Sequence, residues 1–457
     1  MLTIVLFYLT YLGGIAASLV RYPVLAFVTY QAVYFYNPNE RWWSASIPAL
    51  SYSFFTVVVM GLVFIFHIKS TNKNKLLQIP QFRWAYALVA CFAFSYFWSP
   101  YPGGHAYAVE TFVKLMIIIS IAYKLCDTPQ KLTWVLWGHL YGSWYIAYLA
   151  FQVGRNSGNR VQGIGTVDSP DANGIAAAIA PSIALALYFI WQSKTLWLKF
   201  AAAICAVFVA NALILINSRG AILGVGVSVF YLFFVMYFSK VRSTRQKGFV
   251  ILMLISGLAG GLKLADDSFI ERIESMFVSK KEIDFTQESG ATRFLFWKYA
   301  FDMAKDYPFG AGARAFVFYS PSYIPLDVGT GASRNRAVHS TWMEVLTEAG
   351  FIGSFCFVMM LWTTYKTLTQ CEKKFKLEGD IKNYYLIIVI KACLICFMVS
   401  MTFLNRLRAE ILYWMVLYSA CLYNIYILKN HSEIEKPVDE TKLPEPQDKA
   451  SENLTFK

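Results

Sequence analysis

Long apolar runs separated by short polar segments make up most of the chain. A helix needs about 20 mainly apolar residues to cross the hydrocarbon core of a bilayer. The predicted spans are 2–20, 22–36, 48–67, 84–98, 108–123, 132–152, 174–191, 197–216, 220–238, 248–264, 341–365, 384–403 and 410–428. Gly13, Gly14, Arg21 and Pro23 interrupt residues 2–36, which form either two helices or one hairpin, so the predicted number of spans is 12 or 13. This pattern predicts an all-α polytopic membrane protein.

The composition excludes a water-soluble protein. Hydrophobic residues make up 57% of the 457 positions and charged residues only 15%, against roughly 25% charged residues in soluble domains. The formal net charge is +13, but the basic residues form short clusters between apolar runs and no nucleic-acid-binding motif accompanies them. Nucleic acid is therefore not an expected partner. None of the eight cysteines lies in residues 266–340, so we expect neither a disulfide framework nor a thiol metal site.

The distribution of Lys and Arg among the short loops predicts the orientation in the membrane. One alternate set of short loops carries 17 of these residues and the other carries 6, and the richer set is expected in the cytoplasm. Residues 266–340 then form one large loop on the outer side. The predicted organisation is N-terminal transmembrane helices (1–265), this outer loop (266–340), C-terminal transmembrane helices (341–428) and a disordered cytoplasmic tail (429–457).

One segment of the outer loop has the spacing of an amphipathic helix, with Thr292 as a suitable N-cap and Pro308 at its end. Its predicted apolar face is Phe294, Trp297, Phe301 and Ala304, and its polar face is Lys298, Asp302 and Lys305. Such a helix is expected to lie against the membrane surface. Arg293 would sit at the helix N-terminus, where a cation is unfavourable unless an anion shares the site. An ordinary surface arginine is the simpler interpretation.

His339 stands where the outer loop meets the next predicted span. It is the only histidine of the loop, and imidazole is well suited to proton transfer near neutral pH. Arg334 and Arg336 precede it, and neighbouring positive charge favours the neutral imidazole that proton abstraction needs. A histidine that caps a helix start is the simpler interpretation, whereas the two arginines favour a functional one.

Other polar residues also stand at the predicted outer boundary. Arg219 opens a span after almost no loop, and a snorkelling anchor is its default interpretation. Arg314 follows a glycine-rich turn. Lys114 lies four residues after Glu110, and mutual neutralisation within one apolar helix is the simpler interpretation of these two side chains.

A second group of polar residues is a candidate for positioning a sugar or an acceptor. Asp168, Asp171 and Asn173 either orient hydroxyl groups or cap the following helix, and Glu344 lies on the helix that follows His339. A metal site is only weakly indicated, because no histidine joins the two aspartates. By contrast, arginine is plentiful at this boundary, and its planar fork suits the oxygens of a phosphate. A pyrophosphate leaving group at the membrane surface, as on a lipid-linked sugar, would need such a clamp.

Four stretches of this region resemble the O-antigen ligase and O-antigen polymerase superfamily, which includes bacterial protein O-glycosylation ligases. They are Ser218-Arg-Gly-Ala, Thr292-Arg-Phe-Leu-Phe-Trp, Pro308-Phe-Gly-Ala-Gly and His339-Ser-Thr-Trp-Met-Glu-Val-Leu-Thr-Glu-Ala-Gly-Phe-Ile-Gly. Near the N-terminus, Arg21-Tyr-Pro and Tyr36-Asn-Pro-Asn-Glu-Arg-Trp are similar to the exosortase-associated branch. The resemblance covers roughly residues 1–365 and is specific mainly from residue 160 onward.

The resemblance implies a GT-C-like glycosyltransferase of the bacterial inner membrane with its active site facing the periplasm. It implies metal-independent, inverting transfer of a glycan from undecaprenyl pyrophosphate to a hydroxyl of a lipid, a protein or a growing polysaccharide, without a cofactor. The alternatives are a repeat-unit polymerase of the same superfamily and a lipid-linked oligosaccharide transporter. A transporter should carry polar residues along a whole pathway, whereas here they cluster at one side.

The resemblance also implies roles for individual residues. By this resemblance His339 would be the proton acceptor. The pyrophosphate would be bound by Arg219, Arg293, Arg314, Arg336 and Lys114. The family usually has an amide residue directly after the histidine, and this chain has Ser340. That departure leaves the positioning of the acceptor open.

Overall fold

The computed structural model describes residues 2–271, 290–328, 330 and 333–429. Its helices up to the large loop are α1 (Leu2–Val20), α2 (Leu25–Tyr36), α3 (Tyr52–Phe66), α4 (Pro80–Phe94), α5 (Pro102–Leu125), α6 (Pro129–Val153), α7 (Ala172–Ile179), α8 (Ser182–Gln192), α9 (Leu196–Ile216), α10 (Arg219–Phe238) and α11 (Gln246–Leu264). The loop itself contains α13 (Gly290–Asp306) and α14 (Ala315–Tyr323), and after it come α15 (Thr341–Glu378), α16 (Ile381–Met401) and α17 (Glu410–Tyr423). No strand occurs among the described residues, only two isolated bridges, Ser157 with Arg160 and Thr166 with Ser169.

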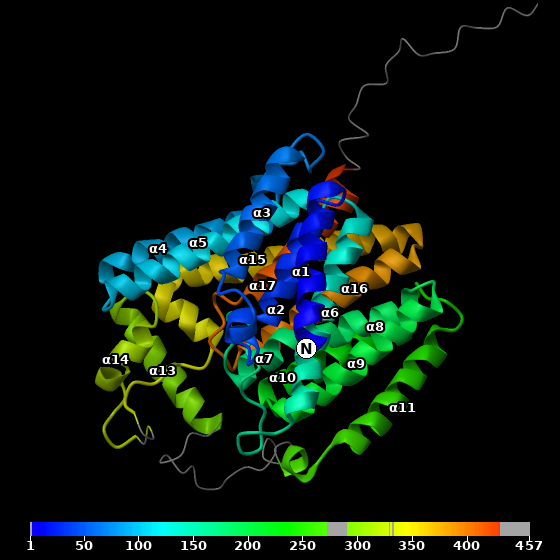
Figure 1. Cartoon of the computed structure of the whole chain (residues 1–457). Helices are drawn as coiled ribbons and strands as arrows, with labels where there is room; N and C mark the ends of the chain where they lie inside the picture. The colour runs from blue at the N-terminus through cyan, green and yellow to red at the C-terminus, as the bar shows by residue number, and fades with distance from the viewer. Residues whose placement is uncertain (1, 272–289, 329, 331–332, 430–457) are drawn as a thin grey trace, which may run out of the picture.

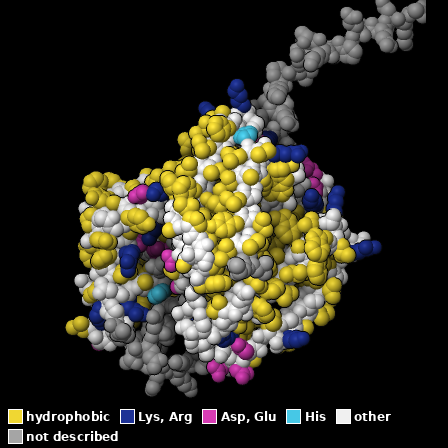
Figure 2. Space-filling view, viewed as in Figure 1, with side chains coloured by type: hydrophobic (Ala, Val, Ile, Leu, Met, Phe, Trp, Pro, Cys, Tyr) yellow, Lys and Arg dark blue, Asp and Glu magenta, His cyan; other side chains and the backbone are white. Residues whose placement is uncertain are grey.

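Every predicted span contains a helix, and the all-α polytopic fold is confirmed. Nine segments of the described chain are helical, long and apolar enough to cross a bilayer: α1, α5, α7 with α8, α9, α10, α11, α15, α16, and α17 with its extension to Leu428. The other predicted spans contain α2, α3 and α4, with 12, 15 and 15 residues, and the 25-residue α6. The number of helices that meet both criteria is thus smaller than the predicted 12 or 13 spans. The exterior fits a membrane setting, since Figure 2 shows a face covered mainly by hydrophobic side chains, with charged ones chiefly at its margins and over the α13–α14 region.

The centre of the molecule is built from α16, α17 and the α7–α8 pair. In these three spans 83%, 78% and 78% of the residues in the most apolar window are buried, against 22% in α1 and 6% in α11. Trp414 of α17 is fully buried and packs its ring against Tyr34 and Phe27 of α2. α1, α11 and the large loop therefore lie at the periphery, around a core to which the last two spans belong.

The ends of several helices follow from local sequence. Pro80, Pro102 and Pro129 each occupy the first helical position, where a missing N–H costs nothing. The predicted span 174–191 is divided into α7 and α8 just before Pro181 and Ser182, because proline cannot donate the hydrogen bond that would continue the helix. These signals could be read directly from the chain.

The predicted amphipathic helix is present as α13, but its predicted start was wrong. α13 begins at Gly290, so Thr292 lies inside the first turn and is not the N-cap. Its buried residues are Phe296, Ala300, Met303 and Ala304, whereas Phe294 and Phe301 are 60% and 45% exposed. Apolar residues occur on more than one side of this helix, and packing against α14 and α15 selects the side. Figure 1 shows α13 and α14 together at one edge of the molecule, near the ends of α4 and α5.

Candidate functional site

His339 is held in an unusual backbone conformation directly before α15. Its φ is +49°, a left-handed value that costs a non-glycine residue free energy and persists only where the surroundings impose it. Both neighbours are fixed. The carbonyl of Val338 accepts a hydrogen bond from Trp297 Nε1 of α13 (3.1 Å), and the amide of Ser340 donates to Asn405 Oδ1 (3.2 Å). The loop and the C-terminal helices therefore determine together where the imidazole lies.

Residues 402–409, here called the α16–α17 linker, run beside this segment. Thr341 Oγ1 donates to the carbonyl of Leu404 (2.7 Å) and accepts from the amide of Arg406 (2.9 Å). The next residue of α15, Trp342, donates through Nε1 to Thr402 Oγ1 (3.0 Å). With the bond from Ser340 to Asn405, these contacts join the linker to the start of α15 at four points.

Two arginines of the linker are paired with carboxylates of the protein. Arg406 donates to Asp171 Oδ2 (2.6 Å) and to the carbonyl of Asp168 (3.0 Å). Arg408 contacts Glu348 at 2.5 Å and Glu344 at 3.9 Å, and its guanidinium lies 5.0 Å from the centre of the Phe92 ring. Burial lowers the pKa of Arg408, but the two carboxylates outweigh burial and hold that pKa above its ordinary value. Arg408 therefore stays charged and neutralises buried acidic groups.

The predicted positioning residues lie beside the α16–α17 linker and its ion pairs. Asp168 accepts from Tyr34 Oη (2.6 Å), from Ser169 Oγ (2.7 Å) and from the first amide of α17, that of Glu410 (2.8 Å). Asp171 caps α7 by accepting from the amide of Gly174 (3.0 Å).

Glu344 and Asn173 have comparable roles. Glu344 is 6% exposed and accepts from the amide of Leu407 (3.0 Å), while Asn173 Oδ1 accepts from Arg160 Nη2 (3.2 Å). Capping of the following helix, α7, is thus confirmed for Asp171 but not for Asp168. Whether any of the four residues contacts a sugar stays a prediction.

Arg219 begins α10 and lies near the same linker. The preceding Asn217 has φ +56°, and its carbonyl accepts from Arg160 Nη2 (3.1 Å). A Cβ on Gly220 would lie 3.5 Å from the carbonyl of Ser400 and 3.6 Å from Phe403. The Phe403 ring in turn lies 6.4 Å from that of Trp297. Phe403 therefore connects the start of α10 to the part of α13 that holds the segment before His339.

The remaining predicted cations are distributed differently. Arg336 donates its amide to Ser320 Oγ (2.8 Å), and its guanidinium lies 5.9 Å from the centre of the Phe296 ring on α13. Arg314 has φ +58°, donates its amide to Glu348 Oε1 (2.6 Å) and exposes its side chain.

Lys114 forms an ion pair with Glu110, as the neutralising alternative predicts, and both side chains are more than half exposed on α5. This pair is not joined to the His339 region by any described contact. Arg293 lies in the first turn of α13, and its side chain is outside the described residues.

The large loop is attached to α15 at a kink. Gly350 has φ +70° and ψ −169°, values that interrupt the helix. The amide of Phe351 donates to the carbonyl of Pro308 (2.9 Å), and the carbonyls of Thr347 and Glu348 accept from Ala311 (2.9 Å) and Gly312 (3.1 Å). A Cβ on Gly350 would overlap the carbonyl oxygen of Pro308. The glycine-rich turn of the loop therefore supplies the hydrogen bonds that the kink removes from α15.

Comparison with known families identifies the region. Residues 204–358 match a family model described as O-antigen ligase. This segment of the chain is therefore similar to O-antigen ligases. The matched segment contains Arg219, Arg293, Arg314, Arg336 and His339, whereas the α16–α17 linker lies beyond it. No curated protein sequence matches the chain.

The match confirms the predicted resemblance to the O-antigen ligase superfamily, whose members are membrane enzymes of ligase or polymerase type. The exosortase-associated branch stays a prediction. Within the described part of the chain, no group of three or more His, Cys, Asp or Glu side chains is arranged to hold a metal ion.

Sequence reasoning missed the linker residues. Arg406 and Arg408 entered only the count of basic residues in the short loops, and Asn405 was not singled out. A signal was present, because two arginines and an amide occur within four residues at the outer boundary between two apolar spans. Polar groups at such a place need partners, and the structure shows which ones they have.

Proposed function

We propose that the chain is a membrane glycosyltransferase that transfers a glycan from undecaprenyl pyrophosphate to an acceptor hydroxyl on the periplasmic side of the bacterial inner membrane. His339 takes the proton of the acceptor hydroxyl. The hydroxyl oxygen then forms a bond to the anomeric carbon while the bond from that carbon to the pyrophosphate breaks. The pyrophosphate leaves with the electron pair, and the anomeric configuration inverts because a single in-line displacement occurs.

The observation that carries the proposal is the convergence around Phe403. Trp297 of α13 donates to the carbonyl of Val338, directly before His339, and its ring faces that of Phe403, which also lies beside Gly220, the residue after Arg219. A general base and a guanidinium that approach one region from different elements are what acyl- or glycosyl-type displacement requires. The base acts on the acceptor, and the cation stabilises charge on the leaving group.

Arg219 is proposed to bind the pyrophosphate, with Arg293, Arg314 and Arg336 as further ligands and Lys114 as the most distant candidate. The exposed guanidinium of Arg314 makes no ion pair with any described carboxylate, so it has charge available for an anionic substrate. Guanidinium groups can bind two phosphate oxygens at once, which fixes the orientation of the leaving group.

Asn405 is proposed as a positioning residue for His339. Its side-chain oxygen accepts from the amide of Ser340, the residue directly after the base. A hydrogen bond there opposes relaxation of the φ of His339 toward a common value. The amide group that the family usually has after the histidine is thus supplied from the α16–α17 linker.

The proposal is tested by transfer with the purified full-length chain and an undecaprenyl-pyrophosphate-linked glycan. His339→Ala should lower kcat by about a hundredfold or more, the usual scale for loss of a general base, and should retain donor binding. The matched control is His67→Ala, because His67 is the C-cap of α3 and its imidazole contacts the carbonyl of Val63 in its own helix (3.0 Å). Near wild-type turnover by His339→Ala, or loss of donor binding together with turnover, would contradict the assignment.

A further inference from the structure

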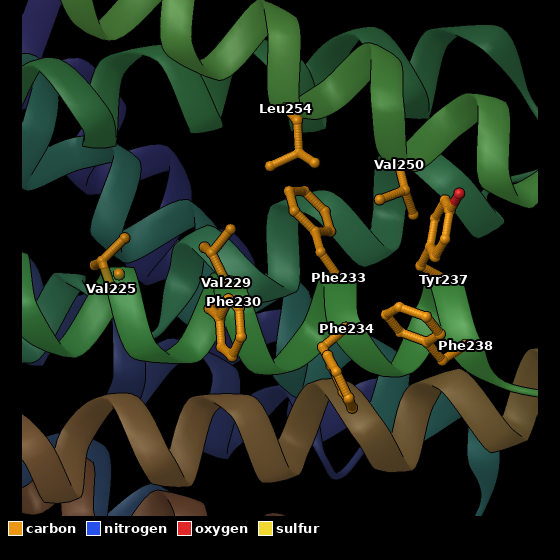
Figure 3. Close-up of a pocket in the computed structure, with 10 residues that line it drawn as sticks. Val225, Val229, Phe230, Phe233, Phe234, Tyr237, Phe238, Val250 and Leu254 are labelled. Atoms are coloured by element: carbon orange, nitrogen blue, oxygen red, sulfur yellow. The ribbon is translucent and has the colours of Figure 1, made fainter.

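An apolar groove lies between α10 and α11, on the side of the molecule away from α13. Its volume is about 490 Å³, and it is lined by Val225, Gly226, Val229, Phe230, Phe233, Phe234, Tyr237, Phe238, Val250 and Leu254. Figure 3 shows Phe233 and Tyr237 of α10 directed toward Leu254 and Val250 of α11. Only 6% of the α11 window is buried, so α11 lies at the periphery of the molecule.

The floor of the groove is a row of aromatic rings. Phe230, Phe234 and Phe238 are 70%, 52% and 65% exposed, and the centroids of successive rings lie 6.0 and 4.8 Å apart. The Tyr237 hydroxyl is the single polar side-chain group of the lining. Such a surface can bind a hydrocarbon chain but offers almost nothing to a sugar or an ion.

The groove is aligned with Arg219. An α-helix turns 100° per residue, so residues 7, 11, 14 and 18 positions after Arg219 lie within about 40° of its direction. These residues are Gly226, Phe230, Phe233 and Tyr237, all of which line the groove. At 1.5 Å per residue the groove begins about 10 Å from Arg219 and reaches about 27 Å from it, close to the roughly 30 Å thickness of the hydrocarbon core.

We propose that this groove holds the polyprenyl tail of the donor while its pyrophosphate is bound at Arg219. This inference rests on the proposed function and adds the place where the lipid part of the substrate binds. The tail of such a donor carries no polar group, is long enough to cross the core, and is attached to the group that Arg219 binds. A single helix, α10, then contacts both chemical parts of the donor.

The bilayer limits how much the groove contributes. Lipid tails are as apolar as the groove, so leaving the bilayer gains little hydrophobic free energy, and van der Waals packing supplies the attraction. The benefit is orientation, because a tail lying along α10 brings its pyrophosphate repeatedly to the same place. The expected contribution is therefore moderate and should appear in KM.

Gly226 permits a test that fills the groove without disturbing packing. A Cβ on Gly226 meets no atom within 4 Å, so Gly226→Phe should project its ring into the groove. Its KM for an undecaprenyl-linked donor should rise about tenfold. For a donor analogue with a single isoprene unit, which is too short to reach this position, KM should stay at the wild-type value.

The matched control is Gly61→Phe, because Gly61 lies in the apolar helix α3 and also has no atom within 4 Å of a Cβ. It should leave both KM values unchanged. An unchanged KM of Gly226→Phe for the long donor, or an equal rise for both donors, would overturn the proposal.

A binding experiment separates this inference from the proposed function. Polyprenyl pyrophosphate with a photoactivatable group on its third isoprene unit should label Phe230, Phe233 or Leu254 in the wild-type chain, whether or not transfer occurs. Labelling confined to other helices, or equally efficient labelling of the groove by a phospholipid with the same group on its acyl chain, would overturn it. If the wild-type chain transfers no glycan from either donor, the proposed function fails, and the labelling pattern still decides what the groove binds.

Discussion

The α16–α17 linker and the α10–α11 groove both lie between helices of the same membrane domain, but they are built from opposite kinds of side chain. The linker brings charged and amide groups into the interior and gives each a partner, as for Arg406 with Asp171 and Arg408 with Glu348. The groove has almost no polar group and leaves three phenyl rings exposed. Directional hydrogen bonds fix positions, whereas apolar contacts tolerate sliding. The linker is therefore suited to hold the base for catalysis, and the groove to accept a flexible chain.

The largest effect expected from this contrast is on stability. Arg408→Met removes the cation between Glu348 and Glu344 and leaves buried carboxylates without compensation, which should lower the free energy of unfolding by about 3–5 kcal/mol. In the groove, a change of the half-exposed Phe234 to Ala should cost only about 0.5 kcal/mol. Unfolding of the purified chain in detergent measures both.

A second substitution shows whether uncompensated charge causes this loss. Arg408→Met combined with Glu348→Gln should recover part of the lost stability, because the closest carboxylate is then neutral. Equal stability of Arg408→Met and the wild type would erase the contrast between the two regions.

A smaller effect is expected at Arg219, which stands where the two regions meet. Arg219→Lys keeps the charge and loses the planar fork, so kcat/KM for the donor should fall roughly tenfold to a hundredfold, as for loss of a hydrogen bond to a charged group. Arg155→Lys is the control, since Arg155 pairs with Asp266 at 2.7 Å and has no proposed contact with substrate. If the two variants behave alike, Arg219 is an anchor in the membrane interface and the proposed link between clamp and groove is lost.

The smallest effect should come from Asn405 and should concern kcat alone. Asn405→Ala removes one hydrogen bond to Ser340, worth about 0.5–1.5 kcal/mol, so turnover should fall about two- to tenfold with KM unchanged. Asn405→Asp keeps the accepting oxygen and should restore turnover. A groove variant should show the opposite pattern, with KM raised and kcat retained. Failure of aspartate to restore turnover would show that Asn405 does more than accept this hydrogen bond, or does something else.

Much of the fold was predictable because apolar runs of fixed length directly encode membrane helices. The prediction was weaker where a helix is apolar on several sides, as in α13, since only its neighbours decide which side is buried. Glycine in the middle of a long span also gave no indication that α15 changes direction at Gly350.

The site was predictable only as a set of candidates. His339 and Arg219 could be placed at one boundary by their motifs and by the orientation of the spans. The partners of the linker arginines could not, because Arg406 and Asp171 are 235 residues apart and no local pattern connects them. Whether a boundary arginine serves the fold or the substrate depends on the carboxylates that tertiary packing brings to it.

The kink at Gly350 also has a mechanical consequence. Three backbone hydrogen bonds join residues 308–312 of the large loop to residues 347–351 of α15, in surroundings where water cannot readily replace them. Displacing this part of the loop alone would break all three, so the loop and the first turns of α15 should behave as one lever with its pivot at the glycine. Because the α16–α17 linker is bonded to the start of α15, any motion of this lever that admits a bulky glycan must carry both His339 and the linker with it.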